Sequence, residues 1–105
     1  MGKKSELFKN LQEPMRQEVG ALSKLMASCI DETGQEVPEC GDALVEVSQA
    51  TYALAKAIVE VADGSEKDTI KSACDKFIKD LYTEDLNKSL FELTQELGTA
   101  VVKAF

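Results

Sequence analysis

The amino-acid sequence predicts an all-α protein, an antiparallel bundle of four main helices with a short leading helix at the N-terminus. Apolar residues recur at steps of three and four through most of the chain, which is the spacing of one helix face. The stretch from residue 43 to residue 62 gathers its polar side chains into one narrow stripe, so most of its circumference is apolar. Such a helix needs neighbours on several sides and is expected at the centre. A chain of 105 residues suits one domain, residues 1–105.

The first periodic segment is interrupted by a proline. Its apolar positions are Leu7, Phe8, Leu11, Met15, Val19, Leu22, Met26, Cys29 and Ile30. Pro14 lies inside the pattern, and an interior proline removes a backbone hydrogen bond and kinks or breaks a helix. We therefore expect a leading helix over residues 4–12 and a first main helix over residues 14–31, with Pro14 in its first turn. Because the apolar seam continues through both pieces, both are expected to cover the same core.

The later helices are delimited by turn and capping residues. Gly34 is the natural left-handed residue after the first helix, and Pro38 suits the first turn of the second. Ser65 resembles the start of a capping box, and Thr83 followed by two acids is a further capping signal. The expected helices span residues 38–63, 66–81 and 84–103. Short links before the last two make consecutive helices antiparallel neighbours.

The apolar seams predict a core and leave several large apolar residues outside it. The core is expected to contain Leu22, Met26, Leu54, Ile58, Phe77, Ile78, Leu90, Leu93 and Leu97. Val45, Tyr52 and Val59 lie off the main seams at seven-residue spacing on one side of the central helix. They form a ridge rather than scattered single residues, so we expect an oligomer interface there. A symmetric homodimer is the simplest closed arrangement.

The residues needed for common catalytic and metal sites are missing. The chain contains no histidine, which removes the commonest general base and metal ligand. No glycine-rich phosphate loop occurs, and the acidic loop lacks the ligand pattern of a calcium hand. We therefore expect no enzyme activity, no catalytic residue, no metal and no cofactor.

The three cysteines, Cys29, Cys40 and Cys74, are single and widely spaced. Cys29 and Cys74 fall on apolar seams, where a thiol behaves as a small hydrophobic group. Cys29 and Cys40 flank the long connection and could form a disulfide, but the odd count and the lack of an export signal argue against one. No window is long enough to cross a bilayer, so a cytoplasmic protein without a membrane partner is expected.

The formal charge of −7, from 19 acidic and 12 basic residues, opposes a phosphate backbone and argues against direct nucleic-acid binding. Between Lys24 and Lys56 no basic residue occurs, so one end of the molecule should carry a negative field. The acids there are the candidate protein-binding residues Asp31, Glu32, Glu36, Glu39, Asp42 and Glu46.

Two hypotheses of function follow. The first is a non-catalytic protein–protein interaction module, of adaptor, inhibitor, immunity or other regulatory type, which binds another protein through the acidic end and helical faces as a homo-oligomer. The alternative is an oligomeric helical protein that holds a small anionic ligand such as a nucleotide or metabolite. Its candidate cations are Arg16, Lys24 and Lys56, with Tyr52 as a stacking surface.

Overall fold

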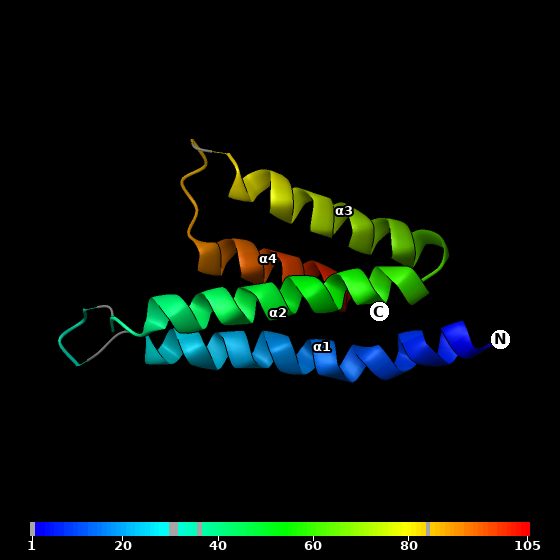
Figure 1. Ribbon diagram of the computed structural model, residues 1–105, viewed down its shortest axis with the longest axis horizontal. Helices are drawn as coiled ribbons and strands as arrows, with labels where there is room; N and C mark the ends of the chain where they lie inside the picture. The colour runs from blue at the N-terminus through cyan, green and yellow to red at the C-terminus, as the bar shows by residue number, and fades with distance from the viewer. Residues whose placement is uncertain (1, 30–31, 36, 84) are drawn as a thin grey trace.

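The computed structural model describes residues 2–29, 32–35, 37–83 and 85–105, and its regular structure is helical (Figure 1). The four helices are α1 (Lys3–Ser28), α2 (Cys40–Val61), α3 (Gly64–Leu81) and α4 (Leu90–Lys103). No strand occurs among the described residues. The expected all-α class is therefore confirmed.

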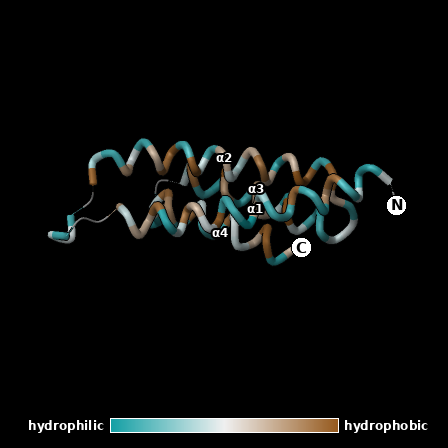
Figure 2. The backbone as a smooth tube through the Cα atoms, turned by 90° about the horizontal axis from the view of Figure 1, so that it is seen from below, coloured by the Kyte–Doolittle hydropathy of each residue, from teal (hydrophilic) through white to brown (hydrophobic). Residues whose placement is uncertain are grey.

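The helices form three layers, with α2 and α4 in the middle one. These two helices pack on each other, and each contacts both α1 and α3. Within the described residues α1 and α3 do not touch, and they lie on opposite sides of the α2/α4 pair (Figures 1 and 2). α2 therefore has neighbours on three sides, as its wide apolar arc requires. The whole structure is elongated, with extents of 53 × 28 × 19 Å.

The predicted break at Pro14 is wrong, because α1 is one continuous helix of 26 residues with Pro14 inside it. Pro14 and Asn10 are both exposed, so the Asn10 carbonyl that loses its helical partner can bond to water. Leu11 before the proline and Met15 after it pack against the same core. Burial on both sides of Pro14 keeps the helix intact despite a cost of about 3 kcal/mol for an interior proline.

The predicted start of the last helix at residue 84 is also wrong, because α4 begins at Leu90. The Ser89 side chain caps α4 by accepting the backbone N–H of Glu92 at 3.2 Å. The Thr83 hydroxyl instead donates to the Lys79 carbonyl at 2.8 Å and so belongs to the end of α3. Ser89 and Glu92 have the spacing of a capping box ahead of an apolar run, which is the sequence signal that indicates the true start.

The end of α1 agrees partly with expectation. The helix ends at Ser28, and residues 30 and 31, where the predicted helix ended, lie outside the described residues. Gly34 has a φ of 82°, which confirms the expected left-handed residue in the connection.

The observed core contains most of the expected side chains. Leu22, Ile58, Phe77, Leu93 and Leu97 are buried as predicted, together with Met15, Ile70 and Val101. Leu54, Ile78 and Leu90 are half-buried against this core. Met26 was expected in the core but is exposed. It lines a pocket with Cys29, Leu44 and Phe91, where α4 covers it only in part.

The expectation of three unpaired cysteines is corrected by a disulfide between Cys29 and Cys40. Their Cα atoms are 5.4 Å apart, because the packing of α1 on α2 brings the end of one helix beside the start of the other. Val37 donates its backbone N–H to the Cys29 carbonyl at 2.8 Å and closes the connection further. Both cysteines are buried. Cys74 is a free, buried thiol on α3, and burial raises its pKa to about 11.

Reduction of the Cys29–Cys40 disulfide should lower the free energy of unfolding by about 3 kcal/mol, because a short closed loop restricts the unfolded chain. Urea unfolding with and without a reducing agent measures this difference. The double variant Cys29→Ser/Cys40→Ser should have the lowered stability from the start and show no further change on reduction. Equal unfolding midpoints of the wild-type protein in both conditions would contradict the bond.

A close approach between α1 and α4 occurs at Gly98. A Cβ atom placed there would lie 2.7 Å from Cγ2 of Val19. Valine in a helix has one strongly preferred χ1 rotamer, so the methyl group cannot easily turn aside. Gly20 offers the opposite case inside α1, because nothing lies within 4 Å of its Cβ position.

Gly98→Ala should destabilise the protein by about 1–3 kcal/mol through overpacking. Gly20→Ala should stabilise it by up to about 1 kcal/mol, since alanine is the better helix former. Chemical unfolding followed by circular dichroism compares the two, and adding Val19→Ala to Gly98→Ala should restore part of the loss. Equal stabilisation by both alanines would show that α1 and α4 are not in close contact.

Candidate protein-binding surface

An apolar groove lies between α2 and α3 at the end where α3 finishes. Its volume is about 240 Å³, and we call it the α2–α3 groove. It is lined by Val45, Ser48, Gln49, Tyr52, Phe77, Ile78, Leu81 and Leu90. Most of these side chains are apolar, so the groove exposes hydrophobic surface from two helices and from the start of a third.

The groove exists because α3 diverges from α2 along its length, as Figure 1 shows. The two helices are joined by only two residues, Ala62 and Asp63, so they start close together. Further along, the rings of Tyr52 and Phe77 stack with centroids 5.6 Å apart and fill the space between them. Beyond this stacked pair the helices separate, and Leu90 at the start of α4 contributes to the floor.

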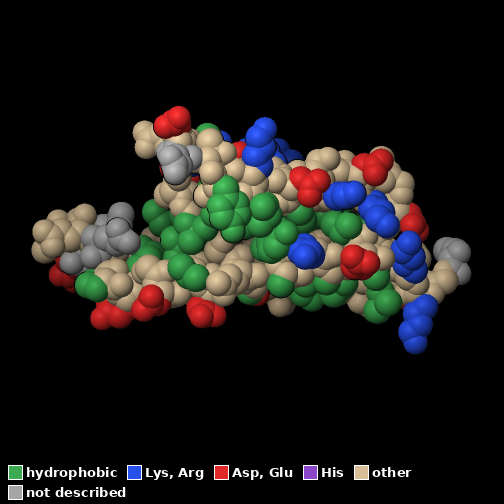
Figure 3. Space-filling view, turned by 45° about the horizontal axis from the view of Figure 1, so that its top comes forward, with side chains coloured by type: hydrophobic (Ala, Val, Ile, Leu, Met, Phe, Trp, Pro, Cys, Tyr) green, Lys and Arg blue, Asp and Glu red, His purple; other side chains and the backbone are tan. Residues whose placement is uncertain are grey.

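Exposed hydrophobic side chains border the groove. Val45 is 42% exposed and Leu81 is 41% exposed, and Tyr82 directly after α3 is 82% exposed. Figure 3 shows hydrophobic side chains forming a broad area across α2 and α3 on this face. Single exposed apolar residues are normal on a protein surface, whereas a contiguous patch usually marks an interaction site. This face is therefore the strongest candidate site on the described part of the chain.

Buried hydroxyl groups fix α2 against α4 beneath the groove. The oxygens of Ser48 and Thr94 lie 2.9 Å apart, and the Thr94 hydroxyl lies 2.7 Å from the Leu90 carbonyl oxygen. Both contacts are satisfied when Ser48 donates to Thr94 and Thr94 donates to Leu90, since each hydroxyl has one proton. The positions of Ser48 and Leu90, which both line the groove, are thereby coupled to each other.

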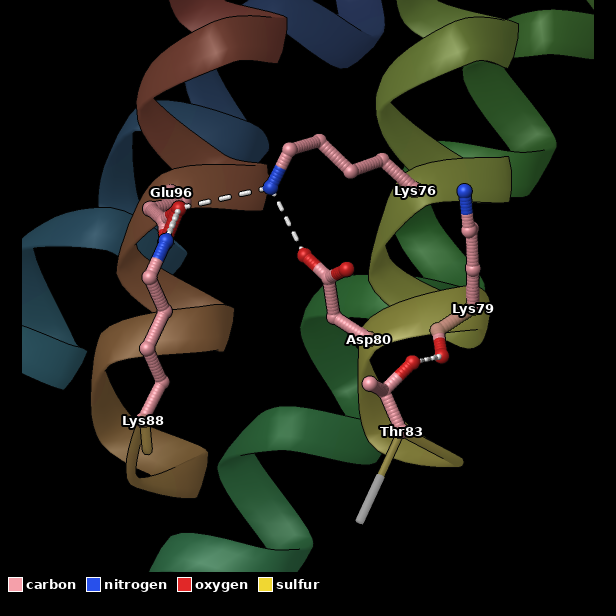
Figure 4. A network of polar contacts seen from close by, with 6 residues as sticks. All are labelled: Lys76, Lys79, Asp80, Thr83, Lys88 and Glu96. Carbon is pink, nitrogen blue, oxygen red and sulfur yellow. Dashed lines mark hydrogen bonds and ion pairs between the residues drawn. The ribbon is translucent and has the colours of Figure 1, made fainter. Parts of the chain in front are cut away.

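An ion network on the other side of α3 holds that helix to α4 (Figure 4). Lys76 of α3 lies 2.7 Å from an oxygen of Asp80 and 3.6 Å from an oxygen of Glu96 on α4. Lys88 binds the same Glu96 carboxylate at 2.8 Å. Exposed pairs contribute little singly, but a network that bridges two helices also restricts their separation. It therefore helps to set the width of the groove.

This network changes the pKa of the Glu96 carboxyl group. Hydrogen bonds from Lys88 lower its pKa below the ordinary value of 4.5, and the charge of Lys76 acts in the same direction against the opposing effect of partial desolvation. A depressed pKa in the folded state adds stability above the pKa of the unfolded chain. That stability is lost as the pH falls through the folded-state pKa.

Lys88→Gln should raise the pKa of Glu96 back toward 4.5, because it removes the first cause of the shift. A carboxyl-carbon NMR titration of both proteins measures the change directly. Glu96→Gln should also reduce the loss of stability between neutral pH and about pH 3. An unchanged Glu96 titration in the Lys88 variant would show that the ion pair does not form in solution.

The acidic end predicted from the sequence lies beside the groove. Asp42 and Glu46 occupy the first two turns of α2, and Glu39 precedes them; all three are exposed and are called the acidic edge. Figure 3 shows acidic side chains gathered along this end of the hydrophobic area. Glu32 is exposed in the connection between α1 and α2. Asp31 and Glu36 lie outside the described residues.

Only two of the three residues in the predicted oligomer ridge lie in the groove. Val45 and Tyr52 both line the groove, whereas Val59 is half-buried and does not. Ile78, Leu81 and Tyr82 were not part of the predicted site, and Ile78 was expected in the core instead. The signal that could have found Leu81 and Tyr82 is a pair of large apolar residues at the end of a helix, since Leu81 is the last residue of α3 and Tyr82 follows it.

The cations of the alternative ligand site are not brought together. The guanidinium carbon of Arg16 lies 5.4 Å from the centroid of the Phe105 ring, near the C-terminus. The Lys56 ammonium lies 5.5 Å from the centroid of the Tyr52 ring, and Lys24 is exposed on α1. None of the three lines the groove.

Comparison with protein-family models, with curated proteins and with solved structures found no match to this chain. Among the described residues, no helix has both the length and the apolar content needed to span a membrane.

Proposed function

We propose that this chain is a non-catalytic protein–protein interaction module that binds another protein through the α2–α3 groove and the acidic edge. The observation that carries the proposal is the continuity of the two features. An apolar groove includes exposed Val45 and Leu81, with exposed Tyr82 next in the chain, and the acidic edge adjoins the groove on α2. A hydrophobic centre with a charged margin is the usual anatomy of a protein interface.

The support around the groove favours binding without large rearrangement. The Tyr52–Phe77 stack, the Ser48–Thr94 contact and the α3–α4 ion network each restrain one wall or the floor. A surface that is already ordered loses less conformational entropy when a partner binds. The proposal includes the antiparallel arrangement of the helices, since the short α2–α3 link requires the chain to reverse.

The symmetric homodimer through Val45, Tyr52 and Val59 stays a prediction. Two of these residues lie in the groove, so a second copy could reach them. Each copy carries a charge of −7, however, and like charges brought face to face oppose association. Binding of a small anionic ligand has less support, because its proposed cations do not converge.

The cytoplasmic location likewise stays a prediction, and the Cys29–Cys40 disulfide weighs against it. Disulfides persist mainly in oxidising compartments and are rare where glutathione keeps thiols reduced.

Leu81→Asp should abolish capture of the natural partner, because it places a charge in the apolar groove. Leu7→Asp is the matched control, since Leu7 on α1 is 42% exposed and does not line the groove. Wild-type and variant proteins are immobilised, incubated with a lysate of the native host, and compared by quantitative mass spectrometry. A protein retained by the wild type and by Leu7→Asp, but lost with Leu81→Asp, supports the module.

Equal capture of every protein by all three baits would contradict a role for the groove. Light scattering at micromolar concentration tests the homodimer in the same samples. A mass near 11.5 kDa excludes it, whereas about twice that mass supports it.

A further inference from the structure

We infer that the α2–α3 groove binds an amphipathic helix with basic residues on the side that faces the acidic edge. This inference rests on the proposed function and names the chemistry of the partner. Its arguments are the helical spacing of the lining residues, the unpaired carboxylates beside them, and the opposite charge at the far end of the groove.

The two walls have the form that a third helix fits. On α2 the lining residues are separated by three and four positions, so they share one helix face. On α3 Phe77, Ile78 and Leu81 have the same kind of spacing, and exposed Tyr82 follows Leu81 directly after the helix. Two diverging helices with apolar inner faces accept the apolar stripe of a third helix, whose anchors recur at three and four residues.

The size of the groove sets the length of the partner segment. Val45 and Tyr52 are seven positions apart on α2, which corresponds to about 10 Å along the helix axis. Two to three turns of a bound helix would cover this length together with Leu81. The hydrophobic contact would supply most of the affinity, since exposed charges contribute little on their own.

The carboxylates of the acidic edge select the charge of the partner. Asp42 is three positions before Val45, one turn nearer the N-terminus of α2, and Glu46 is three positions before Gln49, so both flank the lining residues of α2. Neither carboxylate has an ion-pair partner among the described residues. Lysine or arginine side chains on a bound helix would therefore gain contacts that this chain itself does not provide, and they would speed association.

The charges also orient the partner. Lys56 lies beside Tyr52, at the opposite end of the groove from Asp42 and Glu46. A bound helix should therefore place its basic residues over the acidic edge and keep them away from Lys56. A second copy of this chain fits poorly by the same argument, because its net negative charge meets the same acidic edge.

A synthetic peptide tests the inference directly. The probe has about 18 residues, enough for a stable helix, with a leucine stripe, one tryptophan in that stripe, and lysines along one side. Two control peptides replace the lysines by glutamates, or redistribute the leucines around the helix at constant composition. The protein has no tryptophan, so peptide fluorescence reports binding without background. We expect the basic amphipathic peptide to bind about tenfold or more tightly than either control.

Matched variants locate the bound peptide. Leu81→Asp should weaken binding of the basic peptide by about tenfold or more, whereas Leu7→Asp should leave it unchanged. Glu46→Lys should weaken it by about fivefold and improve binding of the acidic peptide. Glu66→Lys makes the same charge change on an exposed residue in the first turn of α3, and it should have no effect. Circular dichroism verifies that each variant is folded. If Leu81→Asp is unfolded, the comparison of Glu46→Lys with Glu66→Lys locates the bound peptide.

Four results would overturn the inference. Equal binding of the acidic and the basic peptide removes the role of charge. Equal weakening by Leu7→Asp and Leu81→Asp removes the groove as the site. A doubled mass in light scattering that Leu81→Asp returns to 11.5 kDa assigns the groove to a second copy. If no peptide binds while the lysate experiment still yields a groove-dependent protein, the partner class is wrong and the proposed function stands.

Discussion

The unequal lengths of the helices are the constraint on which the rest of this structure depends. α2 has 22 residues and α4 has 14, which correspond to about 33 Å and about 21 Å of helix. The shorter helix cannot cover the apolar arc of the longer one along its whole length. The start of α2, together with the end of α1, therefore extends beyond the part of the molecule where α2 has neighbours on three sides (Figure 1). Both the structural reinforcement and the candidate binding surface lie at or near this end.

Different interactions compensate for the missing coverage. At the tip of the α1/α2 hairpin, the Cys29–Cys40 disulfide joins the end of α1 to the start of α2, near Ser89 and Phe91 at the start of α4. Lys76 and Glu96 connect α3 to α4. On the other side of α3, the stacked rings of Tyr52 and Phe77 fill the space where α2 and α3 begin to separate. None of these interactions closes the space beyond the rings. The remaining hydrophobic surface is the reason why we propose a partner helix as the occupant of the groove.

The sequence by itself determined the fold class, the centrality of α2 and most of the core, because each depends on apolar periodicity within one segment. Capping residues predicted the starts of the helices less well. Thr83 and Ser89 are both competent caps a few residues apart, and only the second starts a helix. Pro14 has a strong local preference for ending a helix, but burial of apolar residues on both sides of it decides otherwise.

The groove itself was decided only by the tertiary structure. Periodicity places Ile78 and Leu81 on one apolar face of α3. The angle between α2 and α3 determines where along its length α2 covers that face. The pairing of Cys29 with Cys40 depends in the same way on two helix ends meeting in space, which an odd cysteine count cannot reveal. Helix formation responds to residues within one or two turns, whereas crossing angles and helix ends depend on contacts between segments distant in the chain. The acidic edge was visible in the sequence, and its position beside an apolar groove was not.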